Sequence, residues 1–340
     1  SPTQLTGLVA AEAKSHRRQH SDQSRFARPA KKNVRRARVV EPETDEEYTA
    51  SEDWRRDCRA VAVLGQGSFG RVHLVTFQGG KFALKSVAVA SLTTPKKREH
   101  ARSERVALAL LRGHPNILRM HAAWTAPGAL HLATECAWGG ELFRHLQRRK
   151  RFAAAETRFI IAELAAALCH AHKHKVAYRD VKPENVLFGG TGHVLLADFG
   201  LSKIVQIDDK DFPTKGCISL CGTPEYMAPE LLLGEVEAYG LAADVFSLGC
   251  VLVELATREA CATCLAREAR NMFEVDGDSL RATLAGAPDS FVELAVQCLA
   301  GEDYERPLAE DAQAWLEELA SEAGAVAAPP PPAEAAPPAP

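Results

Sequence analysis

The stretch from Tyr178 to Gly200 limits what this chain can fold into more than any other part of it. It begins with Tyr-Arg-Asp-Val-Lys-Pro-Glu-Asn at 178–185 and ends with Asp-Phe-Gly at 198–200, and two β-type runs, Val186–Phe188 and His193–Ala197, lie between the two motifs. Asn185 and Asp198 each offer a hard oxygen ligand of the kind that Mg²⁺ prefers. Either motif alone is weak evidence, but their order and separation indicate one site built from both loops.

A glycine-rich motif near the start of the chain is the second constraint. Residues 65–72 follow the pattern G-x-G-x-x-G-x-V, in which glycines let backbone N–H groups approach phosphates. A dinucleotide-binding fold places such a motif between a strand and a helix, with an acidic residue further on. Here the motif lies between two strand-like runs, Val61–Leu64 and Arg71–Phe77, and no suitable acidic residue follows. The pattern therefore favours a phosphate-binding β-hairpin.

Together these motifs resemble the glycine-rich, catalytic and metal-binding loops of eukaryotic protein kinases, over roughly Arg59 to Leu319. The resemblance implies an α+β, two-lobed fold with a nucleotide cleft between a small β-rich lobe and a larger helical lobe. Periodicity agrees with this fold. It predicts a third strand at Phe82–Val87, a helix from Pro95 through Leu111, and the clearest later helices at Thr157–His170 and Asp244–Ala256.

The ends of the chain differ from its middle. Lys14 to Arg38 holds ten Lys or Arg against one acid, and Glu41 to Asp53 then holds seven acids, as solvated tails do. We therefore expect a disordered tail at 1–53, the small lobe at 54–135, the large lobe at 136–320, and an Ala/Pro-rich tail at 321–340. Residues 31–36 are either part of a solvated tail or a nuclear-import patch.

The cysteine content and the apolar runs indicate the cellular compartment in which the chain is expected. Nine scattered cysteines indicate reduced thiols in the cytoplasm or nucleus. The single C-x-x-C, Cys261–Cys264, lacks a second ligand pair, which favours plain thiols over a zinc site. Residues 1–20 lack the apolar region of a signal peptide, and the longest apolar run, Val245–Ala256, is too short and too charged to span a membrane.

The resemblance assigns an ATP site. Lys85 would hold the α- and β-phosphates, and its carboxylate partner would be Glu104, with Glu99 as the competitor. Glu104 is preferred because Leu108 then completes a packed spine with Met120, Phe199 and Tyr178. The other expected nucleotide contacts are Gly65, Gln66, Gly67, Ser68, Phe69, Gly70, Val72, Ala83, Thr134 (the gatekeeper), Glu135, Ala137 and Leu187.

The resemblance to protein kinases also assigns roles in phosphoryl transfer. Asp180 would orient the substrate hydroxyl, Lys182 would stabilise the transferring phosphoryl group, and Asn185 and Asp198 would bind Mg²⁺. Lys182-Pro183-Glu184 and Thr223 are typical of serine/threonine kinases. Two structural contacts are implied as well: an ion pair between Glu230 and Arg306, and Asp244 holding the catalytic-loop backbone.

The kinase group follows from finer detail. Tyr178 before Arg-Asp, Leu220–Tyr226 and Gly139–Phe143 resemble the AGC group, which contains the ribosomal S6 and cyclic-nucleotide-dependent kinases. Two features depart from that group: 258–290 lacks its Pro-Phe, and no Phe-x-x-Phe tail follows the core. The calcium/calmodulin-dependent group is the alternative, although no basic amphipathic helix follows the core either.

Regulation and specificity are expected from the same resemblance. Ser219 would carry an activating phosphate bound by Arg179, Lys203 and His100; the alternative is modification of Thr214 or of no residue. Glu141, Glu184 and Glu254 would select Arg before the phosphoacceptor, unless Glu254 is a core carboxylate with a local partner.

The sequence thus predicts an ATP- and Mg²⁺-dependent protein serine/threonine kinase. Its partners would be protein substrates with Ser or Thr acceptors and an upstream activating kinase, with no nucleic acid and no membrane span. The rival hypothesis is a catalytically silent kinase-fold scaffold that acts through its tails.

Overall fold

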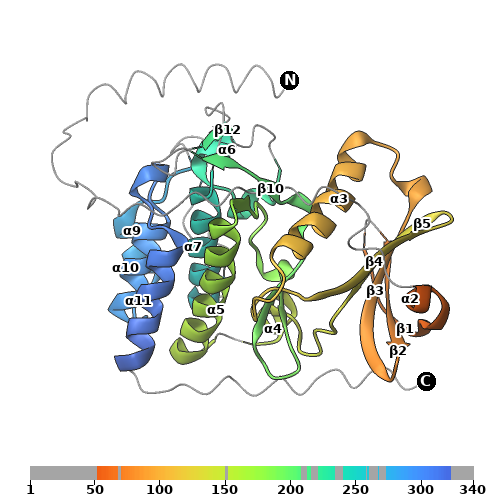
Figure 1. The fold of residues 1–340 in the computed structure, drawn as a ribbon. Helices are drawn as coiled ribbons and strands as arrows, with labels where there is room; N and C mark the ends of the chain where they lie inside the picture. Colours follow the sequence, from red (N-terminus) through yellow and green to blue (C-terminus); the bar gives the residue numbers. More distant parts are fainter. Residues whose placement is uncertain are drawn as a thin grey trace.

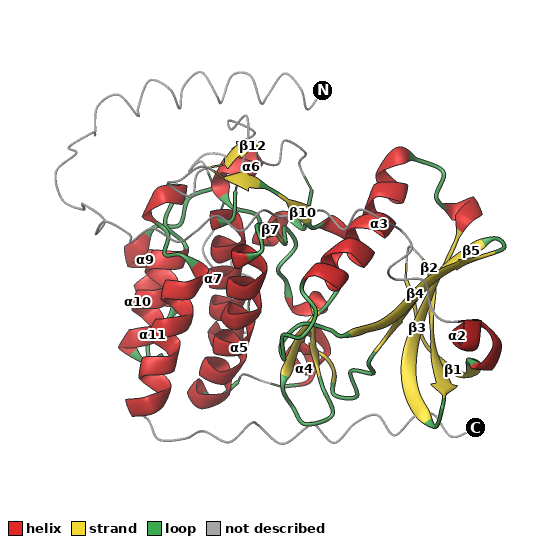
Figure 2. Ribbon diagram, viewed as in Figure 1, coloured by secondary structure: helices red, strands yellow, loops and turns green. Residues whose placement is uncertain are grey.

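Two lobes make up the chain, which is known from a computed structural model (Figure 1). The structure describes residues 52–67, 70–149, 152–207, 213–215, 221–233, 240–257, 259, 267 and 273–322. Residues 52–134 form a lobe that consists mainly of strands, and the other lobe consists mainly of helices (Figure 2). The expected α+β class is confirmed.

The small lobe is a five-stranded antiparallel sheet with one long helix. The strand order is β1-β2-β3-β5-β4, with bounds β1 Arg59–Gly67, β2 Gly70–Phe77, β3 Gly80–Ala88, β4 Met120–Ala126 and β5 Ala129–Thr134. Helix α3, Pro95–Leu110, begins with Pro95 directly after Thr94, whose side chain accepts a hydrogen bond from Lys97 N at 3.3 Å. A proline at the first position after a threonine cap is a typical helix start. The helix predicted from Pro95 is confirmed.

A short helix, α2 (Glu52–Asp57), closes the outer face of this sheet. Its Trp54 stacks on Phe77 with ring centroids 4.0 Å apart and meets Phe82 edge-on at 5.0 Å. Figure 1 places α2 across the sheet from α3. The helix includes two residues expected to belong to the tail. Burial of Trp54 explains the difference, because an aromatic anchor can order acidic neighbours that composition alone assigns to solvent.

The large lobe is a helical bundle around α7 (Ala242–Thr257). From Ala243 to Leu255 every residue of α7 is buried, so other elements surround it on all sides. Helix α5 (Ala154–Lys173) packs against both α7 and α11 (Ala309–Glu322), and α10 (Asp289–Cys298) packs against α7. The shorter helices are α4 (Leu142–Arg148), α6 (Pro229–Leu233) and α9 (Gly277–Thr283). None of the described helices is long and apolar enough to cross a membrane.

The remaining described strands form small sheets of two or three strands. Strands β6 (Gly140–Glu141), β8 (Val186–Phe188) and β9 (Val194–Leu196) form one of them. Strand β7 (Val176–Ala177) pairs with β10 (Lys203–Ile204), and β11 (Gln206–Ile207) pairs with β12 (Pro213–Lys215). The β8–β9 hairpin therefore joins the two motifs at 178–185 and 198–200, as the sequence predicted.

Candidate active site

One buried carboxylate binds the backbone at the start of the catalytic loop, residues 178–185. Asp244, at the start of α7 and 1% exposed, accepts hydrogen bonds from Tyr178 N at 2.8 Å and Arg179 N at 2.7 Å. His172 Nε2 lies 2.9 Å from the same carboxylate. The expected role of Asp244 is therefore present, whereas no sequence signal pointed to His172. Hydrogen bonds to a carboxylate are stronger than neutral ones, so this contact fixes the start of the loop.

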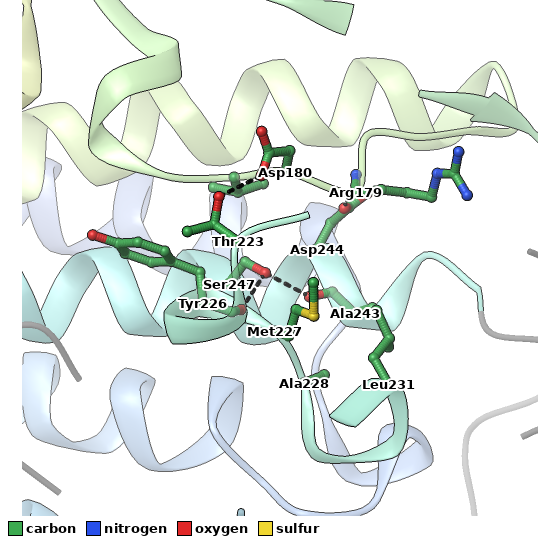
Figure 3. A pocket seen from close by; sticks show the side chains of 11 residues that line it. Arg179, Asp180, Thr223, Tyr226, Met227, Ala228, Leu231, Ala243, Asp244 and Ser247 are labelled. Carbon is green, nitrogen blue, oxygen red and sulfur yellow. Dashed lines mark hydrogen bonds between the residues drawn. The ribbon is translucent and has the colours of Figure 1, made fainter. Parts of the chain in front are cut away.

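Asp180 is the centre of a closed hydrogen-bonded cluster, and Figure 3 shows its contact with Thr223. Thr223 Oγ1 donates to Asp180 Oδ1 at 2.9 Å, and Lys182 Nζ lies 2.8 Å from both Asp180 Oδ2 and Thr223 Oγ1. Asn185 Nδ2 donates to Asp180 Oδ2 at 2.9 Å. The structure thus brings together all four residues that the sequence assigned to catalysis.

Gly222 makes this approach of Thr223 to Asp180 possible. Its φ is +113°, and a Cβ there would lie 2.6 Å from the carbonyl oxygen of Arg179. A side chain at 222 would therefore clash with the catalytic loop and strain the backbone. The motif needs glycine for contact between the two segments.

Two oxygen donors fit a magnesium ion. Asn185 uses its Nδ2 for Asp180, which leaves Oδ1 to act as a ligand. Asp198 adopts a left-handed backbone conformation, is exposed, and accepts a bond from Gly200 N at 3.3 Å. The described residues contain no group of three or more His, Cys, Asp or Glu that could hold a metal. Amide and carboxylate oxygens such as those of Asn185 and Asp198 suit Mg²⁺ that is bound together with nucleotide phosphates.

The predicted ion pair between Lys85 and Glu104 is present. Lys85 Nζ lies 2.7 Å from each oxygen of Glu104, and the side chains are 23% and 13% exposed. Burial alone would lower the pKa of Lys85, but attraction to the carboxylates of Glu104 and Asp198 outweighs it and raises the pKa. The ammonium thus stays charged close to Asp198, which the sequence predicted as a Mg²⁺ ligand.

A packed column connects this pair to the catalytic loop. Leu108, Met120, Phe199 and Tyr178 are all buried. The rings of Tyr178 and Phe199 meet edge-on with centroids 4.9 Å apart, and Tyr178 OH donates to the carbonyl oxygen of Ala197. Helix α3 packs against the 3₁₀ turn at Phe199–Leu201. Packing therefore couples the position of Glu104 to that of Asp198.

Several residues expected to contact the nucleotide lie on paired strands. Ala83 on β3 pairs with Thr134 on β5, and Val72 pairs with Lys85. Thr134 is 7% exposed, and its hydroxyl donates to the carbonyl oxygen of Glu135 at 3.2 Å. The Glu135 side chain accepts a hydrogen bond from Arg119 N at 2.8 Å through Oε1. Leu187 lies on β8 beside Glu141, and Gly140 N donates to the carbonyl oxygen of Ala137.

The glycine-rich motif forms the hairpin that was favoured over a dinucleotide site. Gly65, Gln66 and Gly67 end β1, and Gly67 pairs with Gly70 at the start of β2. A Cβ at Gly70 would lie 2.1 Å from the carbonyl oxygen of Ser86, so the third strand requires glycine there. Ser68 and Phe69, at the tip, lie outside the described residues.

The residues expected to bind a phosphate are partly described. Arg179 Nε donates to the carbonyl oxygen of Leu201 at 2.6 Å, and Lys203 lies on β10, which pairs with β7 just before Tyr178. Burial, together with the charges of Lys96 and Arg179, lowers the pKa of His100. Ser219 lies outside the described residues.

The three expected substrate-selecting acids have different surroundings. Glu141 forms an exposed ion pair with Arg144 at 3.3 Å. Glu254 is 9% exposed and accepts a 2.6 Å bond from Tyr226 OH, which is the local partner that the alternative interpretation expected. Burial raises the pKa of Glu254, and the charge of Glu184 adds to this rise, so these two acids are neighbours. Glu184 Oε2 is buried and has no hydrogen-bond partner among the described residues.

Two arginines tie the following segment to the helical lobe. Arg306 forms the predicted ion pair with Glu230, with two N–O distances of 2.8 Å. Arg267 was not anticipated. It is 7% exposed and donates to the backbone of Glu225 and Met227. Nothing in the residue pattern around it signals a buried arginine.

Comparison with known proteins agrees with this geometry. Residues 58–315 match the family model described as the protein kinase domain. Human ribosomal protein S6 kinase alpha-4 is 42% identical over 203 residues, 58% of this chain and 26% of that protein. Protein kinase 2 of Dictyostelium discoideum is 39% identical over 203 residues, 59% of this chain and 40% of that protein. The serine/threonine protein kinase ypkA of Aspergillus fumigatus is 41% identical over 203 residues, 59% of this chain and 31% of that protein. The match thus spans well under half of each relative.

Proposed function

This chain belongs to the protein kinase domain family, and on that premise we propose that it transfers the γ-phosphoryl group of Mg-ATP to Ser and Thr hydroxyls of protein substrates. The observation that carries the proposal is the cluster in which Asp180, Lys182 and Thr223 contact one another within 2.9 Å. Names of relatives, among them ribosomal protein S6 kinase and ypkA, support a kinase of AGC-like type.

Each residue of the cluster has a distinct task. Asp180 accepts the hydrogen bond of the substrate hydroxyl and aims its oxygen at the phosphorus, taking up the proton late in transfer. Lys182 places a positive charge beside the transferring group. Lys85, fixed by Glu104, orients the phosphates of the nucleotide. Asn185 and Asp198 would hold Mg²⁺, which neutralises phosphate charge when bound.

The substrate proposal rests on Glu184. A buried carboxylate oxygen without a partner carries a desolvation cost that an incoming guanidinium would remove. Glu254 lies beside Glu184, and Glu141 is available at the surface. We therefore expect a preference for Arg two or three residues before the acceptor. A positional peptide library tests this, and a library without any basic preference would contradict it.

The activation proposal rests on Ser219. A phosphate there would bring about −1.5 to −2 charges to Arg179, Lys203 and His100. Phosphorylation by an upstream kinase would join the segment that contains Ser219 to α3. Helix α3 carries His100 four residues before Glu104. Phosphorylated wild type and Ser219→Ala should differ in turnover, and equal turnover would exclude this role.

One assay separates an active kinase from a silent scaffold. Wild type is incubated with Mg-ATP and an Arg-containing Ser peptide, beside Asp198→Asn and the control Asp278→Asn on the exposed surface of α9. We expect Asp198→Asn to lose more than about a hundredfold in kcat, because charge neutralisation at the phosphates is lost. The control should match wild type. No turnover by wild type, with nucleotide still bound, would favour the scaffold.

A further inference from the structure

Arg267 is a buried cation whose acceptors differ from those of an ordinary ion pair. Nε donates to the carbonyl oxygen of Phe273 at 2.9 Å, Nη1 to that of Glu225 at 3.3 Å, and Nη2 to that of Met227 at 2.5 Å. The guanidinium lies over the ring of Phe246, 4.5 Å from its centroid. Within the described part of the chain its acceptors are backbone carbonyls and it forms no salt bridge.

Arg306 provides the contrast within the same region. Its guanidinium lies over the same ring, 5.0 Å from the centroid, but Glu230 neutralises it through two hydrogen bonds. The charge of Arg306 is thus matched by a carboxylate, whereas Arg267 is placed to bind carbonyl dipoles. A planar fork of fixed donors suits two carbonyls on one loop better than a lysine ammonium would.

Those two carbonyls belong to the loop that begins at Thr223. Glu225 and Met227 flank Tyr226, whose hydroxyl donates to Glu254 at 2.6 Å and whose carbonyl oxygen accepts from Ser247 Oγ at 2.7 Å. Three consecutive backbone carbonyls, 225 to 227, are therefore bound by side chains of the helical lobe. Arg267 supplies two of these three contacts.

The same loop lines a pocket beside the catalytic aspartate. Met227 and Tyr226 border it together with Asp180 and Thr223 (Figure 3). A peptide whose hydroxyl reaches Asp180 must place a residue adjacent to the acceptor near this loop, because the loop begins at Thr223, which contacts Asp180. The position of the 225 and 227 carbonyls therefore affects how the peptide binds more than it affects ATP, whose expected contacts include Lys85, Glu135 and Ala137.

We propose that Arg267 is a positioning residue, which holds the Thr223–Ala228 loop where it receives the substrate residue next to the phosphoacceptor. The kinetic effects expected from this inference rest on the proposed function. The expected effect on the structure of the loop does not. Loss of Arg267 should free the loop while leaving the Asp180 cluster and the nucleotide site in place.

The test compares Arg267→Gln and Arg267→Lys with wild type and with Arg281→Gln, an arginine on α9 that is half exposed. For Arg267→Gln we expect the KM for peptide to rise about tenfold, the KM for ATP to change less than twofold, and selectivity for the residues adjacent to the acceptor to weaken. A change of this size would follow the loss of about one charge-assisted hydrogen bond. Arg267→Lys should recover part of the peptide KM, because it keeps the charge and one donor.

Hydrogen exchange gives a readout that does not need turnover. Amides of 221–233 should exchange faster in Arg267→Gln, while those of α7 and β3 should not change. If wild type has no kinase activity but this exchange pattern appears, the proposed function is wrong. The result would still support the role of Arg267 in holding the loop. Unchanged exchange at 221–233, or equal changes in the KM for peptide and ATP, would overturn the role. If Arg267→Gln does not fold, Arg267→Lys decides by the same two measurements.

Discussion

The ion pair between Glu230 and Arg306 gives the sharpest prediction about stability. The Arg306 side chain is 0% exposed and that of Glu230 is 14% exposed. Glu230→Gln keeps the shape of the side chain but leaves a buried guanidinium without a counter-charge, which typically costs about 3–5 kcal/mol. Arg306 also donates to the carbonyl oxygens of Ala300 and Gly301 at 2.8 and 2.9 Å, so we expect the lower end, about 3 kcal/mol.

For a domain of this size that loss should lower the Tm by about 6–12 °C, since 1 kcal/mol corresponds to about 2–4 °C. Circular dichroism at neutral pH measures it, with Glu225→Gln as a matched control on the exposed surface of the same segment. Adding Arg306→Met to Glu230→Gln should cost less than the sum of the single changes, because no unpaired charge remains. A fall in Tm below about 2 °C, or one equal to the control, would refute this reasoning.

Three further outcomes are expected. Thr134→Met, at the rear of the adenine pocket, should weaken inhibitors that reach past the adenine but spare ATP affinity; equal loss for both would show that the register is wrong. Burial and the nearby His174 and His114 lower the pKa of His170 to about 4, below the usual 6.5, so stability present above pH 6.5 should be lost as the pH falls towards 4. His170→Leu should flatten this pH dependence of the Tm. Trp54→Ala should destabilise the small lobe by about 3 kcal/mol, measured by denaturant unfolding, because it empties the aromatic stack on the sheet.

Contacts between short motifs could be predicted from the sequence. The pairs Lys85–Glu104 and Glu230–Arg306 join residues whose motifs fix their place in the fold, and the structure contains both. The resemblance to protein kinases fixed these positions in advance, since it favoured Glu104 over Glu99 for Lys85 and paired Glu230 with Arg306. The start of α3 was equally accessible, since Pro95 after Thr94 is a local signal.

The contacts of Arg267 and Trp54 could not be predicted in this way. Arg267 binds backbone carbonyls, which every residue has, so the residue types in the sequence do not indicate its partners. Trp54 was placed at the start of the small lobe, directly after an acidic run, but no motif there predicted a helix or its packing on the sheet. The hydrogen bond from Tyr226 to Glu254 was anticipated only as an unnamed local partner, because it depends on how the loop folds back on α7.

The position of Trp54 separates two definitions of where this domain starts. The family match begins at Cys58, but the aromatic side chain that covers Phe77, Phe82 and Trp124 lies four residues earlier. A polypeptide cut at the homology boundary would expose these rings to water on one face of the nucleotide-binding lobe. Contiguous apolar patches of this kind promote self-association. A shortened chain therefore needs the tryptophan on α2 as well as the residues of the family match to keep these rings covered.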